Sequence, residues 1–196
     1  MFLSDKTIRE HSLASLMIKP FSEDQLQPAS YDVKLGEWYL DPSYCTKWNP
    51  APFEGKENCL DLRDMPKVSE FMDKKQLGVD GIILAPGKFI LAATLEYFII
   101  PPSIRASIEG KSSLARLGIV PHVAAGYIDP GFRGTITLEI ANIGPFFVRI
   151  RPGDKIAQVA FANVDQECER PYGHPELGSH YQNQAGVQGS KYGRSE

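Results

Sequence analysis

Glycine and proline interrupt this chain at short intervals after residue 78. The interruptions fall at Pro86-Gly87, Pro101-Pro102, Gly110, Gly118, Pro130-Gly131, Gly144-Pro145 and Pro152-Gly153. The runs between them are short and rich in β-branched and aromatic residues, at 81–84, 89–93, 97–100, 135–141, 146–150 and 156–161. Strands of this length and spacing are typical of an all-β sandwich or barrel rather than of a helical bundle. The sequence therefore predicts a mainly β protein.

The segments before this region have other patterns. Ser4 and Asp5 are candidate N-caps of a short helix within residues 4–17, which Lys19-Pro20 should end. A strand-like pattern follows over residues 27–40. The stretch 41–78 mixes prolines with charges, and we expect one helical turn in it, near residues 68–71.

The last 26 residues, 171–196, contain five glycines and few aliphatic side chains, yet they keep three tyrosines. Such a segment buries too little apolar surface to fold alone. It is either a frayed tail or an arm that orders over a ligand or a neighbouring subunit. We expect a single domain over residues 1–196, with 1–20 as the N-terminal helix region and 171–196 as a flexible C-terminal arm.

Composition excludes several classes of function. The 21 Lys and Arg residues against 24 Asp and Glu residues give a net charge of −3, so no general attraction to nucleic acid is expected. No stretch resembles a signal peptide or a membrane span, which favours a cytoplasmic protein without a membrane partner. The three cysteines, Cys45, Cys59 and Cys168, are widely spaced and fit free thiols better than a disulfide framework or a metal site.

Residues 108–118 combine features of an anion-binding site. Two adjacent hydroxyls, Ser112 and Ser113, fall at a plausible helix N-terminus, and Lys111 and Arg116 lie beside them. Backbone N–H groups, hydroxyls and cations together bind phosphates. The first glycine of the Walker A pattern is missing, so this is not that motif. The alternative is a plain capped turn.

Residues 124–134, Ala-Ala-Gly-Tyr-Ile-Asp-Pro-Gly-Phe-Arg-Gly, would let a ligand approach the backbone closely. Within them Asp129 can accept a hydrogen bond from a sugar hydroxyl, and Phe132 can present a ring face. An Asp-Pro-Gly sequence is also an ordinary turn, and this second interpretation remains open.

The strand expected over residues 135–141 alternates cleanly, with Thr137 and Glu139 on its polar face. That face is either solvated or the wall of a pocket. If it lines a pocket, Glu139 is a candidate proton carrier, and Arg116 is the charge that would stabilise its carboxylate form.

Taken together and in order, these segments resemble the dCTP deaminase and dUTPase superfamily. The matching segments are Leu3-Ser4-Asp5, Gln27-Pro28-Ala29-Ser30-Tyr31-Asp32-Val33-Lys34-Leu35, Gly110-Lys111-Ser112-Ser113-Leu114-Ala115-Arg116-Leu117-Gly118, Ile128-Asp129-Pro130-Gly131-Phe132, Thr137-Leu138-Glu139, and Pro171-Tyr172-Gly173 with Tyr181 and Gln184. The resemblance implies a distorted β-barrel or jelly-roll of the dUTPase-like type. It also implies a homotrimer whose active sites lie between subunits.

The resemblance further implies a role for individual residues. Glu139 would donate and accept protons at the base, and Ser112, Arg116 and Asp129 would complete the catalytic set, with Asp129 on the 3′-hydroxyl and Phe132 against the sugar. The expected substrate-binding residues are Lys111, Ser113, Leu114, Ala115, Ala125, Phe132, Thr137, Leu138, Gln158, Tyr172, His180 and Gln184. Of these, Gln158, Tyr172 and Gln184 would close over the triphosphate. No protein metal ligand is expected, and Mg²⁺ would arrive bound to phosphate oxygens.

Deamination at cytosine C4 needs an activated water and a proton for the departing ammonia. Zinc deaminases carry His-x-Glu and Pro-Cys-x-x-Cys signatures, and neither occurs in this sequence. The expected chemistry is therefore metal-independent, with Glu139 beside Arg116, Ser112 and the backbone near Ala125.

The pair Gly126-Tyr127 resembles the bifunctional members of the superfamily, which also cleave the α–β phosphate bond and release dUMP and pyrophosphate. Deaminases that release dUTP usually carry His-Arg at this place. The expected ligands are dCTP and dUTP, with dTTP as a candidate feedback inhibitor. Three alternatives stay open: a deaminase that releases dUTP, a dUTP pyrophosphatase, and a trimer that senses dCTP or dTTP without catalysis.

Two positions depart from the superfamily pattern. Members usually have Thr where this chain has Ala124, and Lys where it has His180. The first change removes a hydroxyl beside the base pocket. The second replaces a permanent cation by a histidine, and His180 would therefore bind phosphate more weakly than a lysine at this position.

Overall fold

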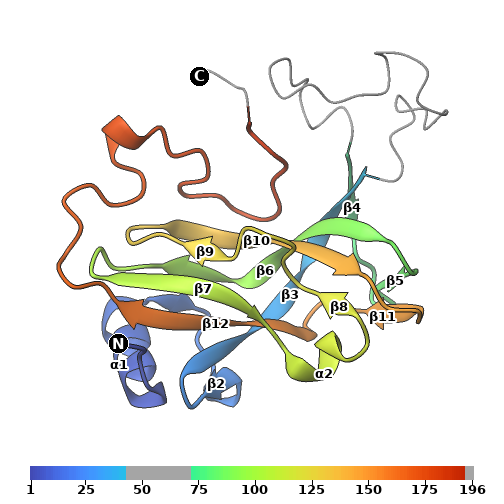
Figure 1. The fold of residues 1–196 in the computed structure, drawn as a ribbon, viewed down its shortest axis with the longest axis horizontal. Helices are drawn as coiled ribbons and strands as arrows, with labels where there is room; N and C mark the ends of the chain where they lie inside the picture. The colour runs from blue at the N-terminus through green and yellow to red at the C-terminus, as the bar shows by residue number, and fades with distance from the viewer. Residues whose placement is uncertain (43–71, 193–196) are drawn as a thin grey trace.

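The protein, seen here as a computed structural model, is described over residues 1–42 and 72–192. Most of the strands in these residues join one curled antiparallel sheet, in the order β8-β10-β6-β3-β12-β7-β9 (Figure 1). These strands are β3 (Ser30–Asp41), β6 (Phe89–Ile99), β7 (Ile104–Gly110), β8 (Ile119–Val120), β9 (Tyr127–Ile128), β10 (Arg133–Asn142) and β12 (Lys155–Asn163). The expectation of a mainly β, dUTPase-like barrel is confirmed.

Five further strands complete the described structure. β1 (Ile18–Lys19) pairs with β6, whereas β2 (Leu26–Gln27) and β4 (Asp73–Gln76) pair with β3. β5 (Ile82–Leu84) and β11 (Val148–Ile150) form a separate two-stranded sheet. The strands β1, β4, β8 and β9 were not expected from the sequence. The predicted turn at 68–71 lies outside the described residues.

The N-terminal helix α1 (Asp5–Ser15) begins where the sequence predicts, directly after Ser4. It ends earlier than expected, because Leu16 adopts a left-handed conformation with φ 56° that terminates the helix. Ile8 is fully buried and anchors α1 to the core. Lys19 therefore belongs to β1, and Pro20 follows that strand rather than ending the helix.

The predicted runs 89–93 and 97–100 are one strand, β6, with an irregularity in its middle. The pairing of β6 with β10 shifts register between Thr135 and Thr137. At the shift, the Thr94 hydroxyl accepts a hydrogen bond from the N–H of Ile136 at 3.0 Å and donates one to the carbonyl of Glu96 at 2.7 Å. A bulge of this kind bends a strand and increases its twist, which is why the polar residues Thr94 and Glu96 interrupt the apolar pattern without ending the strand.

The core fills the inside of the curled sheet. Tyr31, Phe98 and Phe161 are its largest fully buried side chains, and burial of each side chain of this size contributes about 1.5–3 kcal/mol. A second, smaller cluster, Leu40, Leu91, Ala93 and Val187, lies apart from the main core. Val187 belongs to the C-terminal segment, so burial in this cluster ties that segment to the sheet.

Residues 171–192, the C-terminal arm, lie against the start of β10 (Figure 1). The N–H of Thr135 donates to the Gln184 carbonyl at 3.1 Å, and the N–H of Asn183 donates to the Arg133 carbonyl at 2.7 Å. The side chain of Gln182 also accepts from the Arg133 N–H and donates to the Gly131 carbonyl. Residues 171–192 therefore pack on their own chain rather than forming a frayed tail, and ordering of this arm over a ligand or a neighbouring subunit stays a prediction.

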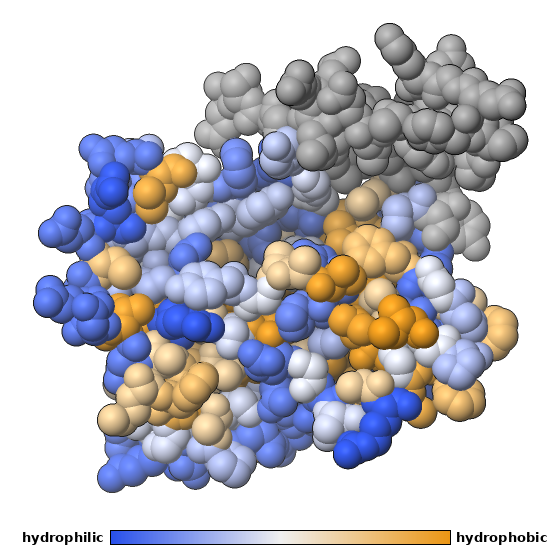
Figure 2. Space-filling model, in the orientation of Figure 1, coloured by the Kyte–Doolittle hydropathy of each residue, from blue (hydrophilic) through white to orange (hydrophobic). Residues whose placement is uncertain are grey.

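Cys168 is a free thiol, as expected, and the other two cysteines lie outside the described residues. No helix among the described residues is both long enough and apolar enough to cross a membrane. On the face shown in Figure 2, polar and apolar side chains are interspersed, with an apolar area on the side where Figure 1 draws β5, β8 and β11.

Candidate active site

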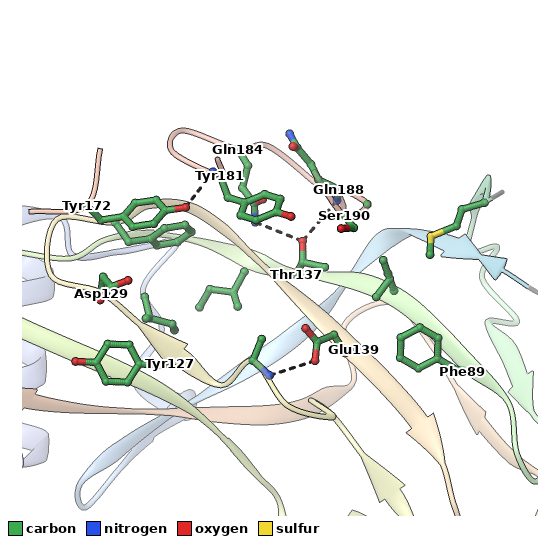
Figure 3. A pocket seen from close by; sticks show the side chains of 17 residues that line it. Phe89, Tyr127, Asp129, Thr137, Glu139, Tyr172, Tyr181, Gln184, Gln188 and Ser190 are labelled. Carbon is green, nitrogen blue, oxygen red and sulfur yellow. Dashed lines mark hydrogen bonds between the residues drawn. The ribbon is translucent and has the colours of Figure 1, made fainter. Parts of the chain in front are cut away.

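A cavity of about 490 Å³ lies between the outer face of β10 and the C-terminal arm. It has three walls (Figure 3). The loop before β10 and the strand itself contribute Ala125, Tyr127, Ile128, Asp129, Phe132, Ile136, Thr137 and Glu139; the arm contributes Tyr172, Tyr181, Gln184, Gln188, Gly189 and Ser190; and the third wall is Met72, Phe89 and Leu91. Of the two interpretations of the polar face of β10, the pocket wall is correct.

Glu139 stands in the middle of this cavity and is held in one orientation. Its Oε2 atom accepts hydrogen bonds from the backbone N–H groups of Ala124 and Ala125, at 3.2 and 3.3 Å. Alternation along β10 places the side chain here, because Leu138 and Ile140 on either side are fully buried in the core. The Oε2 atom is therefore hydrogen-bonded to the loop, whereas Oε1 accepts no hydrogen bond from the described residues.

The end of the cavity beyond Tyr127 is lined by one carboxylate and two aromatic rings. Asp129 is exposed there, and Phe132 packs edge-on against Tyr172 with ring centres 5.8 Å apart. The Tyr172 hydroxyl accepts a hydrogen bond from the Tyr181 N–H at 3.0 Å. Burial raises the pKa of the Tyr172 hydroxyl, so it remains a neutral donor in this wall.

The arm forms the opposite wall and contacts Thr137. The Nε2 group of Gln184 donates to the Thr135 carbonyl and lies 3.4 Å from the Thr137 hydroxyl, and the N–H of Gln188 approaches the same hydroxyl at 3.5 Å. Gln184 was expected at the site. Gln188, Gly189 and Ser190 were not expected, because a polar sequence that contains glycine does not indicate that its residues line a cavity.

The third wall is apolar and was also missed. β6 pairs with β10 so that Leu91 lies opposite Glu139 and Phe89 lies opposite Ala141. Residues opposite each other in an antiparallel pair share a face, so these side chains border the carboxylate. The sequence shows that Phe89 and Leu91 are apolar but not which strand they pair with.

Gly126 does not line the cavity. It lies in the loop at a closely packed position, where an added Cβ atom would stand 2.8 Å from Cε1 of His122 and 3.1 Å from the Ile108 carbonyl oxygen. The Gly126 carbonyl in turn accepts from the Ile108 N–H at 2.8 Å. Gly126 therefore lets the loop pack closely, while its neighbour Tyr127 reaches the cavity and stacks under Arg105, 4.6 Å from the guanidinium carbon.

The segment predicted to bind an anion, residues 108–118, lies outside the cavity. The short helix α2 (Ser112–Ala115) begins at Ser112 as expected, but Ser112, Ser113, Ala115 and Arg116 are exposed and do not line the cavity. The Arg116 guanidinium donates to the Ser112 carbonyl at 3.2 Å. The expected contact of Arg116 with Glu139 is therefore absent within one copy of the described chain.

Lys111 and Gln158 lie with α2 rather than with the cavity, and Leu114 packs against the core. The Lys111 ammonium forms an ion pair with the buried carboxylate of Asp32. The Gln158 side chain accepts from the Ser30 hydroxyl at 2.7 Å and donates to the Gly110 carbonyl at 3.0 Å. These contacts hold the base of the α2 segment in place.

Two more expected contacts differ in the structure. Leu138 points into the core with no exposed surface, because it lies on the other face of β10 from Glu139. His180 does not line the cavity, and its ring packs edge-on against Tyr181 at 6.2 Å. The remaining predicted site residues meet in the cavity: Ala125, Tyr127, Asp129, Phe132, Thr137, Glu139, Tyr172 and Gln184.

A curled antiparallel sheet with a carboxylate cavity on its outer face, closed by the C-terminal arm, places this protein in the dUTPase-like class of β proteins. A crystal structure described as 2′-deoxycytidine 5′-triphosphate deaminase from Agrobacterium tumefaciens matches the fold with a TM-score of 0.62, at 25% identity over 83% of this chain. The match covers 48% of the Agrobacterium chain, so this protein spans about half of its length.

Comparison of sequences gives the family. The family model described as dCTP deaminase-like matches residues 2–164. A Methanosphaera stadtmanae protein named "dCTP deaminase, dUMP-forming" is 41% identical over 96% of this chain and 92% of its own length. A Methanobrevibacter smithii protein of the same name is 38% identical over 96% of this chain and 94% of its own length. The chain belongs to the dCTP deaminase-like family.

Proposed function

We propose that this protein hydrolyses the 4-amino group of dCTP and the α–β phosphate bond, releasing dUMP, ammonia and pyrophosphate. The observation that carries the proposal is the Glu139 carboxylate, fixed by two backbone N–H groups inside a cavity that ends in Asp129 and Phe132. The names of the relatives, all dUMP-forming dCTP deaminases among those described above, favour the same activity.

The deamination step needs one group that both takes and returns a proton. Glu139 Oε1 would accept a proton from the attacking water, which adds to C4 of the base. The same carboxyl would then give that proton to the amino nitrogen as the C–N bond breaks and ammonia leaves. The N–H groups of Ala124 and Ala125 hold Oε2, so the carboxylate need not reorient between the two transfers.

The rest of the cavity suits a deoxynucleotide. Asp129 would accept a hydrogen bond from the 3′-hydroxyl, and the Phe132 ring would occupy the space that a 2′-hydroxyl needs. Thr137, with Gln184 beside its hydroxyl, would meet the polar edge of the base. The apolar wall formed by Phe89 and Leu91 suits the carbon edge of the same ring.

Mg²⁺ would be held by the nucleotide. No group of three or more His, Cys, Asp or Glu side chains that could hold a metal ion occurs in the described part of the chain. Mg²⁺ prefers phosphate oxygens and water to such a cage, so the fit is through the triphosphate, whose charge the ion would neutralise.

A second copy of the chain would complete the site, in a homotrimer. The cavity lining contains two carboxylates and, among the described residues, no lysine or arginine. The hydroxyls of α2 and the cations that flank it, Lys111 and Arg116, do not line it. An exposed apolar patch adjoins α2 and consists of Leu117, Ile143, Phe146 and Phe147. Ile143 and Phe147 are 76% and 74% exposed. Burial of this patch against a neighbour would bring Ser112 and Arg116 to that neighbour's Glu139.

Product analysis tests the activity. The protein is incubated with Mg²⁺ and dCTP, and separately with dUTP, and nucleotides, ammonia and pyrophosphate are resolved over time. We expect dUMP, ammonia and pyrophosphate in equal amounts from dCTP. Accumulation of dUTP would identify a monofunctional deaminase, turnover of dUTP alone a pyrophosphatase, and no turnover of either a nucleotide sensor.

Mixing two inactive variants tests the shared site. Glu139→Gln and Arg116→Ala should each be inactive. If one site draws Glu139 and Arg116 from different copies, subunits exchanged at equal ratio should regain about a quarter of the wild-type activity. If both residues act within one copy, the mixture stays inactive and the trimeric site is wrong.

A further inference from the structure

Lys191 is held against the rim of the cavity by three contacts. Its backbone N–H donates to the Tyr181 hydroxyl at 3.0 Å, and its Nζ atom donates to the His180 carbonyl oxygen at 2.7 Å. The ammonium also lies 5.7 Å from the centre of the Tyr181 ring, within the range of a cation–π interaction. Tyr181 and the preceding residue Ser190 both line the cavity.

The position matters because of the charge of the cavity. Its lining carries the carboxylates of Asp129 and Glu139, and none of the described lining residues is a lysine or arginine. A triphosphate placed here would meet negative charge from both side chains. Some cation at the rim is therefore required if one wall of the site is to hold phosphates.

The Lys191 ammonium is available for that role. An ammonium has three N–H donors, and the His180 carbonyl uses one. No ion pair joins Lys191 to a carboxylate within the described residues, whereas Lys111, Lys155 and Lys88 are each paired with an aspartate. Two donors are left for an anion.

The chain fold explains how a residue near the end of the sequence reaches this place. Val187, 5% exposed, is buried in the small cluster with Leu40 and Leu91. From that anchor, residues 188–191 run back along the cavity to Tyr181. His180, where the superfamily resemblance leads us to expect a lysine, contributes its carbonyl rather than a side-chain cation, and Lys191 places an ammonium beside it.

We infer that Lys191 is a phosphate-binding residue of this site, which supplies from the arm the cation that position 180 lacks. The inference rests on the proposed function, because it assumes a nucleotide triphosphate in the cavity. Lys191 contacts the phosphates rather than the base, so its removal weakens binding of a triphosphate and leaves binding of a monophosphate almost unchanged.

Calorimetric titration of two nucleotides tests this. Glu139→Gln serves as the parent to prevent turnover, and dissociation constants for dCTP and dCMP are measured with Mg²⁺ in the parent and in the parent with Lys191→Met. We expect dCTP affinity to fall about tenfold, the loss typical of one charge-assisted hydrogen bond, and dCMP affinity to change less than about twofold. Lys6→Met on α1, an exposed lysine with the same charge change, is the matched control and should have no effect.

A second substitution separates charge from structure. His180→Lys, added to Lys191→Met, should restore dCTP affinity. Equal weakening of dCTP and dCMP would mean that Lys191 only braces the arm, and unchanged dCTP affinity would mean that it does not touch phosphate; either result overturns the inference while leaving the proposed activity intact. Failure of the parent to bind dCTP at all would overturn the proposed function and this assignment together.

Discussion

The backbone N–H of Ala124 lies 3.2 Å from Oε2 of Glu139, although the two residues are 15 positions apart. The bond joins the loop before β10 to the middle of that strand across the cavity. It occupies one carboxylate oxygen, and no group among the described residues donates to the other. A change to the Glu139 carboxylate should therefore affect proton transfer directly, whereas a change to the loop should affect it through the orientation of Glu139.

Glu139→Gln should abolish ammonia release and preserve binding. The amide oxygen of Gln can still accept from the N–H groups of Ala124 and Ala125, but the side chain cannot take a proton from water. We expect deamination of dCTP to fall by at least about a hundredfold and the dissociation constant to change only slightly. Ammonia assay and calorimetry measure the two quantities, with Glu10→Gln as a surface control. Normal ammonia release would remove Glu139 from the proton-transfer role.

Gly126→His should impair both deamination and phosphate cleavage. A second substitution that makes room for the new side chain should separate the two activities. A Cβ atom at this position stands 2.8 Å from the His122 ring and 3.1 Å from the Ile108 carbonyl, so the single variant shifts the loop that orients Glu139. In Gly126→His with His122→Ala, we expect deamination to recover while phosphate cleavage stays low. Recovery of both activities would mean that Gly126 serves packing alone.

Gly131→Ala should loosen the arm. Gly131 has φ 89°, and an added Cβ would stand 2.6 Å from Cβ of Pro171, where the arm begins. We expect a loss of about 1–3 kcal/mol in stability and faster proteolysis within residues 171–192. Gly153→Ala is the matched control, since Gly153 has φ 85° with nothing within 4 Å. Equal proteolysis in the two variants would show that backbone strain, not the arm contact, matters.

Glu96→Gln should change how stability depends on pH. Glu96 is fully buried, its carboxylate accepts hydrogen bonds from the Lys34 N–H and the Gln25 side chain, and no ion pair joins it to a cation within the described residues. Burial raises the pKa of this carboxyl above its ordinary value of 4.5. The folded state thus binds the proton more tightly than the unfolded chain. The contribution of Glu96 to stability is complete below pH 4.5 and is lost as pH rises through the raised pKa.

The variant lacks this titration, so its urea midpoint relative to wild type should increase as pH goes from 4 to 8 at constant ionic strength. Glu10→Gln, an exposed carboxylate on α1, should show no such trend. Parallel midpoints for wild type and Glu96→Gln across that range would contradict the assignment.

Several features of the fold and the site could be predicted because they are local. Glycine and proline mark the ends of strands wherever the chain turns, Ser4 marks the start of α1, and alternation along β10 separates Glu139 and Thr137 from the buried Leu138 and Ile140. The resemblance to a known superfamily added the roles of Asp129, Phe132 and Tyr172, which line the cavity as expected.

Other features could not be predicted because they depend on which distant segments meet. The bulge at Thr94 merges two apolar runs into one strand, and strand register, not composition, brings Leu91 opposite Glu139. The local sequence pattern predicts neither which strands pair nor their register.

The sequence by itself determined a turn-rich β fold, a carboxylate on the polar face of one strand, and a hydroxyl-rich helix start flanked by cations. The tertiary structure decided that these two groups lie apart within one copy, and that the arm closes the cavity with Lys191 at its rim. The physical reason is that turn chemistry and alternation act over a few residues, whereas a binding site forms where long-range packing and hydrogen bonding bring distant residues together.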